Sequence, residues 1–159
     1  MNVTEIIRAL KTDVSVGQWN TGHVSRSAFP ISSARAKNYK FGSEYKWRVI
    51  KFDCLNRSFR ILILLNEAKQ IYRATLGIEV ENEMAIICQH EFHASEPGWH
   101  CHVTMADDST LPIGVVRQHL RRWPASSARH SRMEFGVSMA NAVSLAAARF
   151  RVSEVGPLV

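Results

Sequence analysis

The sequence predicts an α+β fold, in which helices cover one face of a five-stranded antiparallel meander sheet over about residues 45–105. Two observations predict it: apolar and polar residues alternate through the centre of the chain, and apolar residues recur at helical spacing toward both ends. The chain has 159 residues, a length typical of one domain that can bury a core without disulfide bonds. We therefore predict that residues 1–159 form a single domain.

The N-terminal part of the chain combines a short helix with an irregular segment. Apolar residues lie at helical spacing over residues 3–12, and Asn2 or Thr4 can cap this helix. Residues 14–43 are rich in Gly, Ser, Asn and Pro and have only weak periodicity. We expect this second segment to be an irregular or mobile arm.

Five strands follow, separated by short polar turns. They are predicted over residues 45–54, 58–66, 70–80, 84–92 and 99–105. Short connections can join antiparallel neighbours, whereas parallel strands need long crossovers. The five strands should therefore lie side by side in sequence order.

Two helices are predicted after the fifth strand. The first begins near Pro112, ends before Pro124 and has an apolar face formed by Ile113, Val116, Leu120 and Trp123. The second covers residues 133–150 and buries a stripe formed by Phe135, Met139, Val143, Ala146 and Phe150. Together with the short N-terminal helix they would pack on one face of the sheet, which is an α+β arrangement.

The chain is basic, and its positive charge is uneven. It has 20 Lys and Arg against 14 Asp and Glu, which gives a net charge of +6. No acidic residue lies between Asp108 and Glu134, and this stretch contains Arg117, Arg121, Arg122, Arg129 and Arg132. Stretches of one charge sign attract polyanions. We expect these five arginines to bind an anionic partner, which can be a nucleic acid, a nucleotide or another polyanion.

Several function classes lack their sequence signals. The longest apolar run, residues 61–65, is too short to cross a membrane, and the N-terminus has no secretion-signal pattern. The three cysteines contain no CxxC pair, which fits reduced thiols. There is no GxxxxGKS/T phosphate loop, GxGxxG turn or GxSxG elbow. We expect a soluble, cytoplasmic protein with no membrane partner.

Histidines gather in one segment, "HEFHASEPGWHCH". It holds four of the seven histidines in the chain, namely His90, His93, His100 and His102. A turn at "ASEPG" would make this segment the hairpin between the fourth and fifth predicted strands. Side chains alternate along a strand, so His100, His102 and Thr104 share one face of the fifth strand.

The register of this hairpin decides which residues join His102. One register brings Glu91 and His93 beside it. A shift by one residue brings Cys88 and His90 there instead. The sequence leaves both registers open.

Three interpretations of the histidines remain open. The first is a metal site, in which three imidazoles, or two imidazoles and one carboxylate, hold a zinc ion. The candidate imidazoles are those of His90, His93, His100 and His102. The second is acid/base chemistry, in which His102 and either His100 or His93 form the catalytic pair and Thr104 is a hydrogen-bond donor. The third is a structural role at a solvated hairpin.

Two short motifs resemble those of the two-histidine phosphoesterases. "HVT" at residues 102–104 and "HVS" at residues 23–25 each fit H-x-S/T, a motif that occurs in pairs in that family. The resemblance implies that both histidines project into one cleft and act on cyclic phosphates or oligonucleotide ends. The sequence departs from the family in two ways: His23 lies outside the predicted strands, and the predicted meander lacks the helices of the family.

The sequence therefore predicts a protein that binds or acts on a phosphate-bearing ligand. As an enzyme it would be a hydrolase or transferase of phosphodiesters. The alternative is a non-enzymatic interaction or inhibitor protein that binds a nucleic-acid or protein partner through its basic helix and loop, with structural histidines. The oligomeric state is left open.

Overall fold

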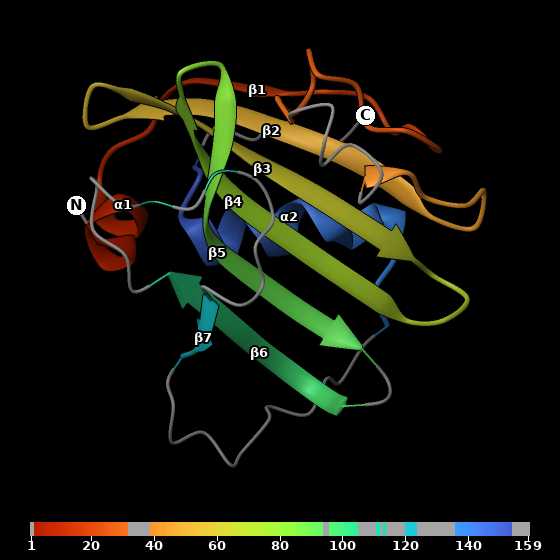
Figure 1. Cartoon of the computed structure of the whole chain (residues 1–159). Coiled ribbons are helices and arrows are strands. Elements are labelled where there is room, and N and C mark those ends of the chain that lie inside the picture. Colours follow the sequence, from red (N-terminus) through yellow and green to blue (C-terminus); the bar gives the residue numbers. More distant parts are fainter. Residues whose placement is uncertain are drawn as a thin grey trace.

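One seven-stranded antiparallel sheet dominates the computed structural model (Figure 1). The strands follow one another across the sheet in sequence order, from β1 to β7. The structure describes residues 2–31, 39–93, 96–104, 111, 113, 120–123 and 136–153, without the side chains of residues 96–98. Each described strand therefore pairs with its neighbours in sequence.

The bounds of the elements place most of the sheet in the middle of the chain. The strands are β1 Thr12–Val16, β2 Lys46–Cys54, β3 Arg57–Asn66, β4 Ile71–Val80, β5 Glu83–His93, β6 Glu96–Thr104 and β7 Leu120–Arg122. The helices are α1 Val3–Arg8 and α2 Met139–Phe150. Within the described residues, no helix has the length and apolar character needed to span a bilayer.

Two tight turns set the registers of the central strands. Leu55 and Asn56 join β2 to β3, and Glu81 and Asn82 join β4 to β5. All four residues have positive φ, between 50° and 64°. Two-residue hairpin loops of this backbone type match the right-handed twist of the strands, and asparagine tolerates the left-handed conformation well. The turns thus favour the observed pairing.

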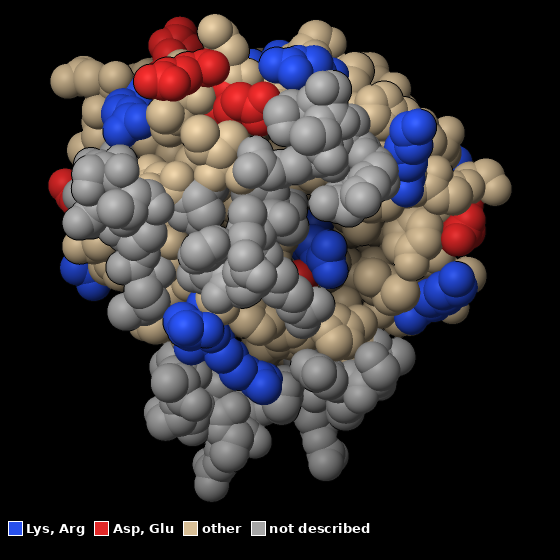
Figure 2. Space-filling model, viewed as in Figure 1, with Lys and Arg blue, Asp and Glu red and all other residues tan. Residues whose placement is uncertain are grey.

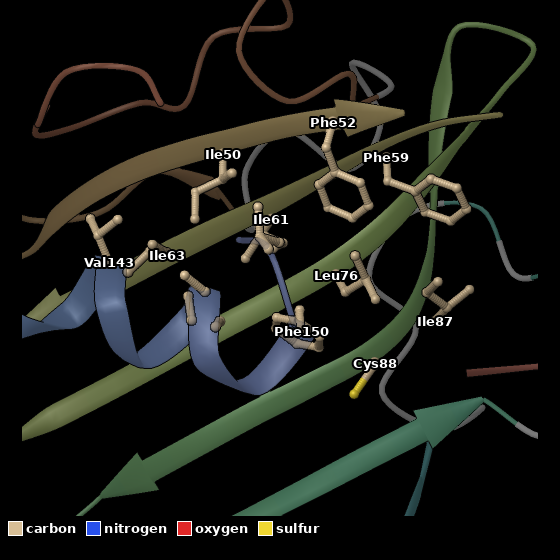
Figure 3. Packing of buried hydrophobic residues seen from close by; sticks show 14 of the residues in the cluster. Ile50, Phe52, Phe59, Ile61, Ile63, Leu76, Ile87, Cys88, Val143 and Phe150 are labelled. Carbon is tan, nitrogen blue, oxygen red and sulfur yellow. The ribbon is translucent and has the colours of Figure 1, made fainter. Parts of the chain in front are cut away.

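Helix α2 covers one face of the sheet. Its buried side chains recur at helical spacing and are Ala142, Val143, Ala146, Ala147 and Phe150. Figure 3 shows Val143 and Phe150 over the apolar side chains of the central strands, with Cys88 of β5 on the same side. Phe150 is 1% exposed, and truncating such a side chain to alanine costs about 3–5 kcal/mol. This face therefore holds the main core.

The start of α2 is held to the β3–β4 turn by hydrogen bonds. The Val137 amide donates to Gln70 Oε1 at 2.9 Å, and Gln70 Nε2 donates to the Val137 carbonyl at 3.1 Å. The Met139 amide donates to Glu67 Oε1 at 2.7 Å. These hydrogen bonds satisfy backbone amide groups at the start of α2, which have no acceptor within the helix itself. Met139 belongs to the predicted buried stripe but is 38% exposed, and Phe135 lies outside the described residues.

Helix α1 is shorter than the predicted helix over residues 3–12. Asn2 and Glu5 form a reciprocal capping box at its start. The Lys11 ammonium donates to the carbonyls of Ile6, Ile7 and Ala9 at 2.7–2.8 Å. A cation at a helix C-terminus satisfies the last carbonyl groups, so Lys11 ends the helix instead of continuing it.

The opposite face of the sheet carries a second, smaller core. Part of it comes from the segment predicted as an arm, through the buried residues Val24, Phe29, Ile31 and Tyr39. They pack with Leu62 and Leu64 of β3 and other strand residues. The same segment contributes most of β1, which pairs with β2. Residues 32–38 of this segment lie outside the described part of the chain.

The predicted five-stranded sheet with three helices on one face is wrong. The sheet has seven strands, because β1 and β7 extend it at its two edges. Leu120–Arg122, predicted as helix, pairs with β6, where unpaired backbone groups of an edge strand accept another strand. Tertiary pairing outweighs the helical spacing of these residues. The structure describes two short helices, not three.

Candidate metal centre

The register of β5 and β6 decides which polar side chains meet. Glu91 pairs directly with His100, and Gln89 pairs with His102. Residues opposite each other in an antiparallel pair project to the same face. Glu91, His100 and His102 therefore share the face that α2 does not cover. Of the two registers open in the sequence, this is the one that brings Glu91 to the histidines.

Three side chains converge on one point, and we call Glu91, His100 and His102 the acid–histidine cluster. Glu91 Oε2 lies 3.3 Å from His100 Nε2 and 3.8 Å from His102 Nδ1. One ligand atom from each residue lies within 4.8 Å of the other two. The side chains of Glu91 and His100 are 2% and 1% exposed, whereas that of His102 is 17% exposed. Solvent therefore reaches the cluster from the His102 side.

Arg73 of β4 holds the second oxygen of Glu91. The two residues are cross-strand partners, and Arg73 Nε lies 2.5 Å from Glu91 Oε1. A buried carboxylate needs such a partner, because its charge loses the solvation of water. The ion pair engages Oε1, while Oε2 faces the two imidazoles. Contacts of this kind orient a carboxylate for binding a metal ion.

His93 and Thr104 extend the row of polar side chains. The rings of His93 and His100 meet edge to face at 4.8 Å, and those of His100 and His102 at 5.3 Å. Thr104 lies two residues beyond His102, on the same face of β6. Three imidazoles thus stand side by side, with the carboxylate contacting the second and the third.

Two buried polar residues lie next to the cluster. Gln89, opposite His102, is 3% exposed, and Thr75, opposite Gln89 on β4, is also 3% exposed. Gln89 Nε2 lies 3.5 Å from Thr75 Oγ1. Polar side chains thus continue across β4, β5 and β6 on the face that also carries the second core.

His90 does not join this group, although it was a candidate metal ligand. It pairs with Cys101, so its side chain lies on the α2 face. Its ring stacks on Trp99, with the ring centroids 4.7 Å apart. Burial, and after it the positive charge of Arg149, lowers the pKa of His90 to about 3. His90 is therefore neutral at pH 7.

The described arginines among the predicted anion-binding residues lie on opposite faces of the sheet. Arg122 of β7 pairs with His102 and lies on the cluster face, whereas Arg121 pairs with Val103 and lies on the other. Arg117, Arg129 and Arg132 lie outside the described residues.

The second motif of the phosphoesterase resemblance is separate from the cluster. His23 is exposed and forms an isolated backbone bridge with Lys40, outside the named strands. It is not one of the three cluster residues.

Positive charge is visible on the face that carries the cluster. Figure 2 shows Lys and Arg side chains around much of this view, and one of them lies in a hollow beside an acidic side chain. The whole chain carries a net charge of +6. The described part of this face therefore offers positive charge to an approaching anion.

The donor set of the cluster suits a transition metal. Two imidazoles and one carboxylate bind zinc in metallohydrolases, with metal–ligand distances of about 2.0–2.2 Å. A tetrahedral site of that size places neighbouring ligand atoms about 3.3 Å apart. The separations of 3.3 and 3.8 Å from Glu91 Oε2 to the two imidazole nitrogens are close to this value, and the three ligand atoms all lie within 4.8 Å of one another. Small side-chain movements would complete the coordination and leave a position for water.

Sequence reasoning found the histidines but missed three of their neighbours. Arg73, Thr75 and Gln89 are not part of any motif. The register of β4 against β5 brings Arg73 and Thr75 to the cluster, and the register of β5 against β6 places Gln89 opposite His102. The alternation of "QIYRATLGIEV" gave a usable signal, because Arg73, Thr75 and Glu79 alternate with apolar residues and so mark a polar face of this strand.

Comparisons with protein-family models, curated proteins and solved structures find no match for this chain. The function is therefore inferred from the geometry of the acid–histidine cluster.

Proposed function

We propose that this protein binds a divalent transition metal, zinc foremost, through Glu91, His100 and His102, and that it hydrolyses a phosphodiester there. The observation that carries the proposal is the approach of Glu91 Oε2 to two imidazole nitrogens at 3.3 and 3.8 Å in a nearly buried site. A zinc ion held by these residues would lower the pKa of bound water and polarise a phosphoryl oxygen.

The residues around the cluster have matching roles. Arg73 orients the carboxylate through Oε1. Arg122, opposite His102 on β7, lies where a guanidinium can bind a phosphate group next to the exposed ligand. His93 lies beside His100 and is the remaining imidazole for proton transfer to a leaving group.

Metal binding is tested first, on protein purified without chelators. We expect about one zinc per chain by elemental analysis, and a zinc affinity that falls at least about 100-fold in His102→Ala, since losing a ligand costs more than losing an outer partner. His23→Ala is the matched control, because His23 is an exposed histidine outside the cluster. A folded wild-type protein that takes up no zinc would refute the metal site.

Hydrolysis is tested with bis(p-nitrophenyl) phosphate as the probe. We expect turnover that a chelator abolishes and that added zinc restores. Zinc binding without turnover would leave a metal-binding interaction protein. Turnover that survives chelation would instead assign the chemistry to the imidazoles alone, with Glu91 orienting His100 as the acid/base partner.

A further inference from the structure

Two thiols lie in contact on the other face of the β5–β6 pair. Cys88 Sγ and Cys101 Sγ are 3.1 Å apart. Cys88 is 0% exposed and Cys101 is 4% exposed. Figure 3 shows Cys88 on the side of the sheet that α2 covers, and Cys101 belongs to the same buried cluster.

The strand register explains this contact. Cys88 pairs with Val103, and His90 pairs with Cys101, so the two cysteines are diagonal neighbours on one face. A disulfide bond is about 2.05 Å long, so the sulfur atoms need to approach by about 1 Å. Diagonal partners on neighbouring strands are about 7–8 Å apart at Cα, slightly more than a disulfide usually spans, so side-chain rotation and a small shift of the two strands together supply that movement.

The third cysteine cannot take part in this bond. Cys54 lies on β2, three strands away from β5. Neighbouring strands are about 4.8 Å apart, so about 14 Å separates β2 from β5, far more than a disulfide spans. Cys54 is also buried and reduced, so it is an internal control of the same residue type.

The surroundings select a small oxidant. His90, which pairs with Cys101, stacks on Trp99, and Trp99 also contacts Tyr72. The Arg149 guanidinium of α2 lies beside Cys101. Cys88 and Cys101 are 0% and 4% exposed, which excludes a bulky thiol such as glutathione. Hydrogen peroxide is only slightly larger than a water molecule, and Cys101 is the less deeply buried of the two cysteines.

We propose that Cys88 and Cys101 are a redox-active pair that hydrogen peroxide converts to an intramolecular disulfide. The Cys101 sulfur attacks one peroxide oxygen, the O–O bond breaks, and a sulfenic acid and water form. The Cys88 sulfur then attacks the Cys101 sulfur, the S–O bond breaks, and a second water leaves. The two thiols lose two electrons and two protons in total, and the peroxide is reduced to water.

The test counts free thiols on the full chain. Reduced protein is freed of reductant, treated with hydrogen peroxide in slight excess, unfolded in an alkylating agent and analysed by mass spectrometry. We expect alkylated cysteines to fall from three to one, with Cys54 remaining and a Cys88–Cys101 linked peptide appearing.

Variants separate this pair from general oxidation. Cys54→Ser should still lose both remaining thiols, whereas Cys101→Ser should form no disulfide and should keep the melting temperature of the reduced wild type within a few degrees. If all three thiols remain alkylatable after peroxide, or if Cys54 enters the disulfide, the proposal is overturned. Dithiothreitol should restore all three thiols.

Discussion

The two faces of the β5–β6 pair carry different chemistry on the same stretch of strand. The face away from α2 holds a carboxylate, three imidazoles and an arginine partner. The face under α2 holds two thiols in contact and one neutral histidine. Side-chain alternation alone separates the two sets, although His100, Cys101 and His102 are consecutive in sequence.

The comparison shows that histidines gathered in sequence need not act together. His90 and His102 belong to the same motif, but one stacks on Trp99 beneath α2 and the other faces a carboxylate. Burial favours the neutral form of His90. The face that a residue occupies therefore decides its role more than its neighbours along the chain do.

The largest effect should come from changing the carboxylate. Glu91→Gln keeps the shape of the side chain but removes its charge, so zinc affinity should fall at least about 100-fold by calorimetric titration. Peroxide-dependent formation of the Cys88–Cys101 disulfide should be unchanged, since it belongs to the other face. Equal loss of both properties would contradict the separation of the faces.

Acid should also act through the face under α2. The folded pKa of His90 is about 3 against 6.5 for an ordinary histidine, so its contribution to stability is present above pH 6.5 and is lost as pH falls toward 3. Between pH 7 and pH 5 this loss amounts to about 2 kcal/mol, a roughly 30-fold change in the unfolding constant. Urea unfolding should show that His90→Gln loses about that much less stability over this range than the wild type.

A smaller effect should link the two faces: formation of the Cys88–Cys101 disulfide should lower the affinity of the acid–histidine cluster for zinc. The disulfide would pull Cys101 toward Cys88, and Cys101 lies between the ligands His100 and His102. Displaced ligands bind a metal less well, so we expect zinc affinity to fall about 10-fold in the oxidised protein. Cys101→Ser treated with peroxide is the control, and identical affinities before and after oxidation of the wild type would show that the faces are uncoupled.

The smallest effect concerns the adjacent arginines of β7. Arg122→Ala should raise KM for a phosphodiester a few-fold, corresponding to about 1 kcal/mol of lost charged hydrogen bonding, and should leave zinc affinity unchanged. Arg121→Ala is the matched control, because Arg121 lies on the opposite face of the same strand. Equal increases in KM would mean that only net charge matters.

The strands of the sheet were the most predictable part of the fold. Alternation and short turns located β2 to β6 to within a few residues, because each strand pairs locally. The edge strands were not predictable in this way. Thr12–Val16 has little alternation, and Leu120–Arg122 carries helical spacing, so both owe their structure to pairing with a neighbouring strand.

The site was predictable as a group of residues but not as a geometry. The motif pointed to His93, His100, His102 and Thr104 and left the hairpin register open. The register of β5 against β6 selects Glu91 and excludes His90, and the register against β4 adds Arg73. These choices depend on pairing between strands, which side-chain periodicity within one strand does not specify.

The most direct measurement is X-ray absorption spectroscopy of the zinc-loaded, reduced protein. Binding at the acid–histidine cluster predicts a shell of nitrogen and oxygen atoms at about 2.0–2.1 Å, with the multiple scattering of two imidazoles and no sulfur. Zinc–sulfur scattering at about 2.3 Å would place the ion at the thiols beneath α2, and a folded protein without bound zinc would leave the cluster with no metal at all.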